Sequence, residues 1–262
     1  LTKSDAAEVS RILLEKSKSS KITYFDHHMI PSTADEDALA AIEHVHKLNV
    51  SASELIFRHY QKDIPKERIW IALYGAIGDY EDDTPFVQDR IVNWDRRALY
   101  FEVSTLIMGI KMQDFSTYDA KRRIVQTMSI GKNPSDVPGL VSAAKQAVNQ
   151  EFELYAYIKS HAEKRGRLGV VTNIPQCGFR GPAALFAATV MDTDVGMYIW
   201  ERENHVDITV RKRKSPVELN VVMEAAAETV GGSGGGHPAA AGARIPKDKL
   251  DKFIHQVNKM IA

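Results

Sequence analysis

The chain carries an Asp-His-His triplet, Asp26, His27 and His28, directly after a run rich in β-branched and aromatic residues. The run, residues 21–25, has the length and composition of a strand. Ligands of α/β sheets commonly bind at the carboxyl ends of strands, and imidazole with carboxylate suits divalent transition metals. By itself the triplet is compatible equally with a metal site and with a hydrogen-bonded histidine pair on the surface.

A second acid stands at the end of an apolar run, where residues 70–78 stop at Asp79. A carboxylate at the end of a buried run is costly unless water or a cation stabilises it, and a metal ion would be such a cation. The alternative is that Asp79 is a turn or capping residue ahead of the acidic residues 81–83.

A glycine-rich segment, residues 231–242, places His237 between Gly234, Gly235 and Gly236 and a run of small residues. Backbone amides without side chains can approach an anion closely, and a histidine adds a charge-assisted hydrogen bond to a phosphate oxygen. A flexible linker is the alternative, but a linker has no need of a histidine followed by Ala-Ala-Ala-Gly. The segment predicts a phosphate-binding loop.

A basic run, residues 211–214, follows a predicted strand upstream of that segment. Such a run is usually a solvated surface. Arg211 or Arg213 could nevertheless reach the same anion, so we expect one of them to assist in binding it.

The elements that must position these residues indicate an α/β protein. Apolar spacing predicts helices over residues 5–18, 51–61 and 66–78 around the strand at 21–25. Residues 86–165 are predicted to be helical apart from a loop at 130–139, with a long helix at 140–164. Strands follow at 168–172, 184–189, 196–200 and 206–210, with a helix at 216–229. We expect a parallel-sheet domain over 1–115, a helical connector over 116–164 and a smaller α/β domain over 165–262.

Composition excludes several classes of protein. Lys plus Arg and Asp plus Glu both total 34, so no overall basic field attracts nucleic acid from a distance. The single cysteine, Cys177, rules out an internal disulfide framework and is expected to be an inert small residue. No apolar run reaches the length of a membrane span, and we expect a cytoplasmic protein without membrane contact.

Aromatic side chains give little information about a substrate, because most of them belong to the core. Trp70, Trp94, Trp200 and Tyr80 are weak candidates for base stacking. Phe179 with Arg180 is the best candidate, because the surrounding glycines and proline predict an exposed loop at 177–182.

The triplet, the Gly78-Asp79 pair and the glycine-rich segment, in this order and spacing, resemble the DHH phosphoesterase family and its DHH-associated C-terminal domain. RecJ-like and oligoribonuclease-like members share the layout most closely. The resemblance implies that His27 ligates one of two Mn²⁺ ions, with Mg²⁺ as an alternative metal, and that Asp79 bridges both.

The resemblance also assigns the remaining residues. Asp26 would orient the His27 ligand without binding the metal itself, and His28 would face the scissile phosphate. Gly234, Gly235, Gly236 and His237 would hold the phosphate or terminal nucleotide of the substrate, with Arg211 or Arg213 assisting.

The sequence departs from the family pattern ahead of the triplet. Family members carry there a strand-end motif with His and an Asp-x-Asp pair, then a further Asp, whereas this sequence offers only Asp5, a predicted helix cap. We therefore expect an additional N-terminal segment of about 50 to 80 residues in the intact protein. A protein that is naturally this short is expected to be inactive.

The predicted function is metal-dependent hydrolysis of single-stranded nucleic acid ends, short oligonucleotides, or linear or cyclic dinucleotides. The alternative is a catalytically inactive DHH-family subunit that binds or scaffolds a replication or repair complex. Pyrophosphatase and polyphosphatase relatives fit less well, because their C-terminal domain does not usually carry this glycine-histidine signature. The sequence leaves open the choice between RNA and DNA, the polarity of digestion and the oligomeric state, a homodimer included.

Overall fold

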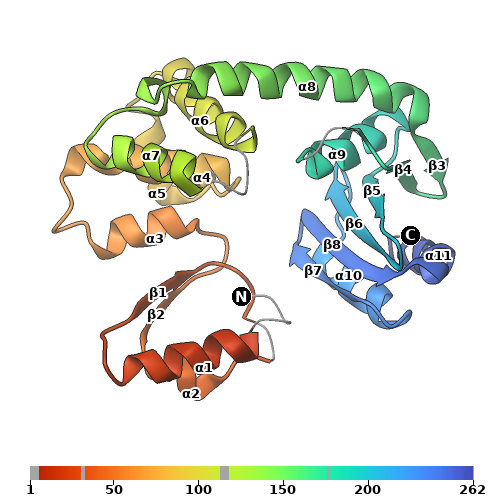
Figure 1. Cartoon of the computed structure of the whole chain (residues 1–262), viewed down its shortest axis with the longest axis horizontal. Coiled ribbons are helices and arrows are strands. Elements are labelled where there is room, and N and C mark those ends of the chain that lie inside the picture. The colour runs from red at the N-terminus through yellow and green to blue at the C-terminus, as the bar shows by residue number, and fades with distance from the viewer. Residues whose placement is uncertain (1–5, 31–32, 113–117, 176–177, 262) are drawn as a thin grey trace. The chain divides into compact units, whose positions relative to one another are not determined.

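The computed structural model describes residues 6–30, 33–112, 118–175 and 178–261 (Figure 1). The chain divides into two compact units, Leu1–Lys145 and Gln146–Ala262. Asp5 and Cys177 lie outside the described residues, as do the expectations attached to them. None of the helices within the described ranges combines the length and the apolar character that a bilayer crossing requires.

The first unit places a two-stranded parallel sheet among helices (Figure 1). Strand β1 (Thr23–Asp26) pairs with β2 (Glu43–His46), and Asp26 lies opposite His46. The helical elements in chain order are α1 (Ala6–Ser17), α2 (Glu36–Ala40), α3 (Ala52–His59), η1 (Lys66–Arg68), α4 (Ile69–Gly78), α5 (Pro85–Ile91), α6 (Arg96–Lys111), α7 (Tyr118–Ser129), η2 (Pro134–Asp136) and the start of α8 (Leu140–His161). Because the strands are parallel, their carboxyl ends meet at one edge.

Helix α4 lies at the centre of the hydrophobic core of this unit. Its residues are apolar on nearly every side, and Trp70, Leu73 and Tyr74 are buried. They pack against buried side chains of α5, α6 and α7, among them Ile91 and Leu99. A helix that is apolar all round is stable only when other elements cover it, so α4 is fixed in place and carries Asp79 at its end.

The second unit is built on a six-stranded mixed sheet with the order β3-β4-β5-β6-β8-β7. Its elements after α8 are β3 (Glu163–Arg165), β4 (Leu168–Thr172), α9 (Arg180–Val190), β5 (Val195–Glu201), β6 (His205–Lys212), α10 (Leu219–Glu228), β7 (Ser233–His237), β8 (Ala240–Pro246), η3 (Lys247–Lys249) and α11 (Leu250–Met260). Strands β4 and β5 are parallel, and the other neighbours are antiparallel.

The two faces of this sheet have different covers. Met197 and Ile208 point to a core shared with Met223 of α10 and Phe253 of α11. Successive strand residues point to opposite faces, so Gly196 faces the other side, where α9 packs closely on β4 and β5.

The α/β class predicted from the sequence is confirmed, as are the helices that became α1, α3, α4, α8 and α10 and the strands that became β1, β4, β5 and β6. The strand predicted at 184–189 is wrong, because these residues belong to α9. Its small residues Ala183, Ala184, Ala187 and Ala188 recur at helical spacing and are fully buried. The three-part division at 115/116 and 164/165 stays a prediction.

The prediction of an exposed loop at Phe179 is also wrong. Phe179 is 0% exposed at the N-terminus of α9, so its ring is not available for base stacking. Arg180 begins the helix, with its guanidinium 4.0 Å from the centroid of the Trp200 ring. The glycine and proline that follow belong to the first turn of the helix rather than to a loop.

Gly196→Ala is expected to destabilise the second unit by at least about 3 kcal/mol, because its Cβ would overlap the carbonyl oxygen of Ala184 in α9. Hydrogen exchange of the β5 amides would measure the loss. Gly231→Ala is the control: φ there is +75° and nothing lies within 4 Å of an added Cβ, so only the backbone cost of about 1 kcal/mol is expected. Equal protection in the two variants would contradict this account of the α9 packing.

Candidate functional site

The Asp-His-His triplet lies where β1 ends. Asp26 is the last residue of the strand, is 7% exposed, and accepts hydrogen bonds from the Tyr24 hydroxyl (3.0 Å) and the His28 backbone amide (3.0 Å). The Nδ1 atom of His28 lies 2.8 Å from the same carboxylate. Asp26 therefore fixes the position of the His28 ring.

Two pKa shifts follow from this arrangement. Burial by itself raises the pKa of Asp26, but the hydrogen bonds from His28 and Tyr24 outweigh it, and the pKa lies well below its usual range. Burial and then the charge of Asp26 raise the pKa of Tyr24 to about 12. The Asp26 carboxylate is therefore ionised at neutral pH and accepts hydrogen bonds in that form.

His27 points to the second predicted residue, Asp79. The two come from distant parts of the chain, yet His27 Nε2 lies 3.5 Å from Asp79 Oδ2. His27 is buried, whereas the Asp79 side chain is 50% exposed at the C-cap of α4. A hydrogen bond from Ser53 of α3 to the Ala72 carbonyl (3.1 Å) helps to hold α4 in place. The structure thus brings together one imidazole and one carboxylate that are each suited to a divalent metal.

The neighbouring strand contributes a histidine that the sequence analysis missed. His46 ends β2, and its Nε2 donates to the carbonyl oxygen of His28 at 2.7 Å. On the same strand His44 stacks on Tyr24, with ring centroids 5.5 Å apart. Burial, and then the charge of His46, lower the pKa of His44. The sequence signal was the polar run Glu43-His44-Val45-His46, which shows too little apolar alternation to predict a strand.

The donors present supply only part of a metal centre. Within the described ranges, no group of three or more His, Cys, Asp or Glu side chains is arranged to hold a metal ion. His27 and Asp79 form a pair of adjacent donors, whereas each ion of a two-metal site needs several ligands. A complete metal site is therefore not formed by the described residues alone.

The glycine-rich segment of the second unit is a β-hairpin rather than a loop. Gly235 lies opposite Gly242, and His237 lies opposite Ala240 across β7 and β8. An added Cβ at Gly234 would overlap the Met223 carbonyl oxygen of α10. Close packing of α10 on the hairpin is thus one reason for the glycine, and the flexible-linker alternative is wrong.

The two arginines have different surroundings. Arg211 of β6 lies opposite Ala240 of β8, and His237 of β7 lies opposite the same Ala240 on its other side. Arg211 and His237 are therefore in register, two strand spacings or about 10 Å apart. Its guanidinium lies beside Gly181 at the start of α9. Arg213 instead forms an ion pair with Asp192 (2.5 Å) and donates to the Thr193 carbonyl (2.9 Å). The sheet therefore places Arg211 beside the hairpin, and Arg213 is held by the loop after α9.

Comparisons with known proteins agree with this organisation. Residues 181–262 match the family model of the DHHA1 domain. No curated protein matches the chain. Among solved structures, the pGpG-specific phosphodiesterase PggH from Vibrio cholerae is similar with a TM-score of 0.54 and 15% identity, over 91% of this chain and 80% of that chain.

Two further solved structures have the same fold. The DHH domain of a protein described as a member of a family of ribosomal proteins gives a TM-score of 0.66 at 14% identity, over 96% of this chain and 65% of that chain. RecJ from Thermus thermophilus in complex with Mn²⁺ gives 0.57 at 16% identity, over 99% of this chain and 43% of that chain. This chain thus spans less than two thirds of the length of both. The chain has the fold of the DHH-family proteins and carries a DHHA1 domain, which confirms the resemblance seen in its sequence.

Proposed function

We propose that the chain contributes hydrolytic and substrate-binding residues to a metal-dependent phosphodiesterase. Its substrates would be single-stranded nucleic acid ends, short oligonucleotides or dinucleotides. The observation that carries the proposal is the 3.5 Å approach of His27 to Asp79 at the carboxyl end of β1. Proteins of the same fold include a pGpG-specific phosphodiesterase and a RecJ solved with Mn²⁺, which supports the reaction class and the use of a divalent metal.

His27 and Asp79 would be two of the metal ligands in this proposal. Divalent ions, when bound, would lower the pKa of a coordinated water and neutralise charge on the phosphoryl oxygens. The half-exposed Asp79 carboxylate is accessible to such an ion, and the buried His27 ring is oriented toward that carboxylate. The described residues do not supply the remaining ligands, because they contain no group of three or more His, Cys, Asp or Glu side chains arranged to hold a metal ion.

His28 would act on the phosphate itself. Its Nδ1 is engaged by Asp26 and its carbonyl oxygen by His46, so both ends of the residue are held. The other ring nitrogen, Nε2, therefore points away from the Asp26 carboxylate. When Nε2 carries a proton, it can donate to a phosphate oxygen or deliver that proton to the leaving oxygen.

The hairpin would hold the substrate by a second phosphate or by its terminal nucleotide. Gly235 and Gly236 have no side chains to exclude an anion from the β7 backbone, and His237 ends the strand. Arg211 is the arginine placed in register with this end of the hairpin. We therefore assign the assisting role to Arg211 in preference to Arg213.

The second candidate function is a catalytically inactive subunit that binds nucleic acid within a larger complex. The observation that favours it is the partial metal site among the described residues, because two donors do not build a two-metal centre. The hairpin and Arg211 would keep their binding role in such a subunit. A nuclease assay therefore separates the two candidates, whereas a binding assay does not.

His27→Ala is expected to reduce Mn²⁺-dependent hydrolysis of pGpG and of short single-stranded RNA by at least about 100-fold, because a metal ligand is lost. The measurement is product formation by the purified protein. His255→Ala, an exposed histidine of α11, is the matched control and is expected to keep wild-type rates. Hydrolysis at equal rates in wild type and His27→Ala would refute the metal assignment, and absence of hydrolysis in the wild type would favour the inactive subunit.

His237→Ala is expected to raise the KM for pGpG by about 5- to 50-fold with a smaller change in kcat, because it removes a charge-assisted contact to a phosphate remote from the bond that breaks. Steady-state kinetics at fixed Mn²⁺ concentration would separate the two parameters. An unchanged KM would remove the hairpin from substrate binding while leaving the His27 result to stand by itself.

A further inference from the structure

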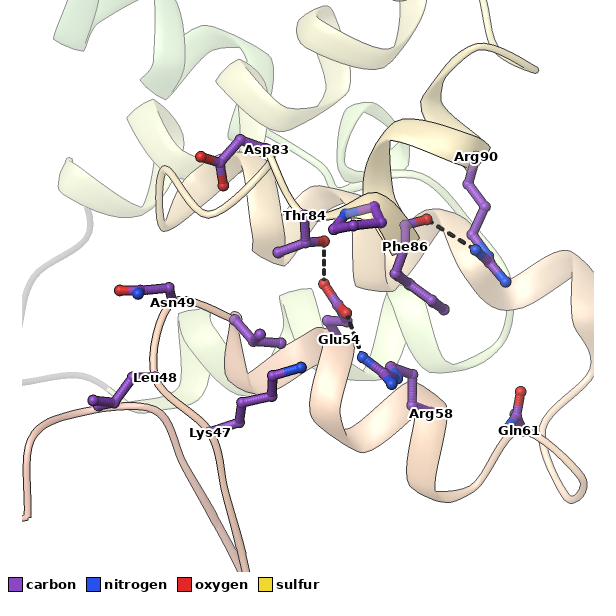
Figure 2. Close-up of a pocket in the computed structure, with 12 residues that line it drawn as sticks. Lys47, Leu48, Asn49, Glu54, Arg58, Gln61, Asp83, Thr84, Phe86 and Arg90 are labelled. Atoms are coloured by element: carbon purple, nitrogen blue, oxygen red, sulfur yellow. Dashed lines mark hydrogen bonds and ion pairs between the residues drawn. The ribbon is translucent and has the colours of Figure 1, made fainter.

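The first unit contains a pocket of about 720 Å³ whose residues play no part in the proposed hydrolysis (Figure 2). It is lined by residues 47–50, 54, 58, 61, 83–86 and 90. Its first residues follow the carboxyl end of β2, and the Lys47 amide donates to the Asp26 carbonyl on the neighbouring strand (3.3 Å). The volume is in the range of small-molecule sites, and the carboxyl ends of strands are where α/β sheets bind ligands.

A buried carboxylate organises one wall of the pocket. Glu54 is 0% exposed, and its two oxygens accept from the Thr84 hydroxyl at 2.7 Å and from Arg58 Nη1 at 3.1 Å (Figure 2). A buried charge without these partners would be strongly destabilising. The pairing therefore holds the Arg58 guanidinium, whose side chain remains 46% exposed, at the pocket surface.

The pocket has more positive than negative charge left for a ligand. Figure 2 shows the Lys47 side chain directed toward the Glu54–Arg58 pair, and within the described part of the chain Lys47 Nζ makes no ion pair or hydrogen bond. Arg90 adds a third cation, 3.8 Å from the centroid of the Phe86 ring. The acids are Glu54, which pairs with Arg58, and the exposed Asp83, so the three cations exceed the two acids by one charge. This excess suits a small anion such as a phosphate group.

Part of the lining is apolar. Leu48 is 43% exposed, Pro85 is exposed and Phe86 is half-buried, so they offer a surface for a flat or apolar group next to the cations. We propose that this pocket binds a nucleoside monophosphate, with its phosphate at Lys47 and Arg58 and its nucleoside against Leu48, Pro85 and Phe86. The site needs neither a metal ion nor the glycine hairpin, so it is independent of the proposed hydrolysis.

The proposal predicts that adenosine 5′-monophosphate, added to the full chain in excess EDTA, shifts the backbone amide resonances of Lys47, Asn49, Thr84 and Phe86. Adenosine and inorganic phosphate added separately should each bind at least about 5-fold more weakly than the nucleotide, because each makes only half of the contacts. Amides of Gly234–Gly236 report on the hairpin in the same spectra, so binding at the two places is told apart.

Lys47→Gln is expected to weaken the nucleotide affinity measured at the pocket amides by about 5- to 20-fold, through loss of one charge-assisted contact. Lys132→Gln, at an exposed lysine outside the pocket, should leave it unchanged. Pocket amides that do not move at millimolar nucleotide, or that respond equally in the two variants, would overturn the site. Equal affinity for inorganic phosphate and the nucleotide would overturn the nucleoside part of the assignment.

Discussion

The parallel pairing of β1 with β2 is the constraint on which the first unit depends. It sets Asp26 opposite His46, so the carboxyl ends of both strands deliver their polar residues to one edge. From there His46 reaches the His28 carbonyl, and Lys47 begins the loop that lines the cationic pocket. A slip of one residue in this register would turn every side chain of the strand to the opposite face. The site and the pocket would both be lost.

Hydrophobic burial supplies the second requirement, which is that Asp79 reaches His27. Asp79 is not part of a strand but lies at the end of α4. The apolar surface of α4 must be covered by α5, α6 and α7. The burial of Trp70 and Leu73 thus determines where a half-exposed carboxylate stands. Asp26 likewise combines two roles, because the three hydrogen bonds to this nearly buried acid both stabilise its charge and orient a histidine.

In the second unit, close approach of backbones explains glycines that composition alone would attribute to a flexible segment. The absence of a side chain at Gly196 lets α9 pack closely on the sheet, and its absence at Gly234 lets α10 pack closely on the hairpin. The glycine-rich segment is therefore an ordered pair of strands with a structural reason for at least one of its glycines. A role in binding phosphate is compatible with this packing, because Gly235 is opposite Gly242 and neither brings a side chain to the sheet surface.

The sequence by itself determined the elements with a strong local pattern and the chemistry of the key residues. Helices such as α1 and α3, strand β1 and the imidazoles that follow it are all readable from neighbouring residues, because amphipathic period and residue type are local properties. Only the tertiary structure decided that residues 184–189 are helical, that residues 231–242 form a hairpin, and that Arg211 rather than Arg213 stands beside it. It also revealed β2 and His46, which lack a clear apolar alternation. These outcomes depend on which distant backbone supplies the hydrogen-bond partner and which surface covers the apolar face, and neither is encoded within a short window of sequence.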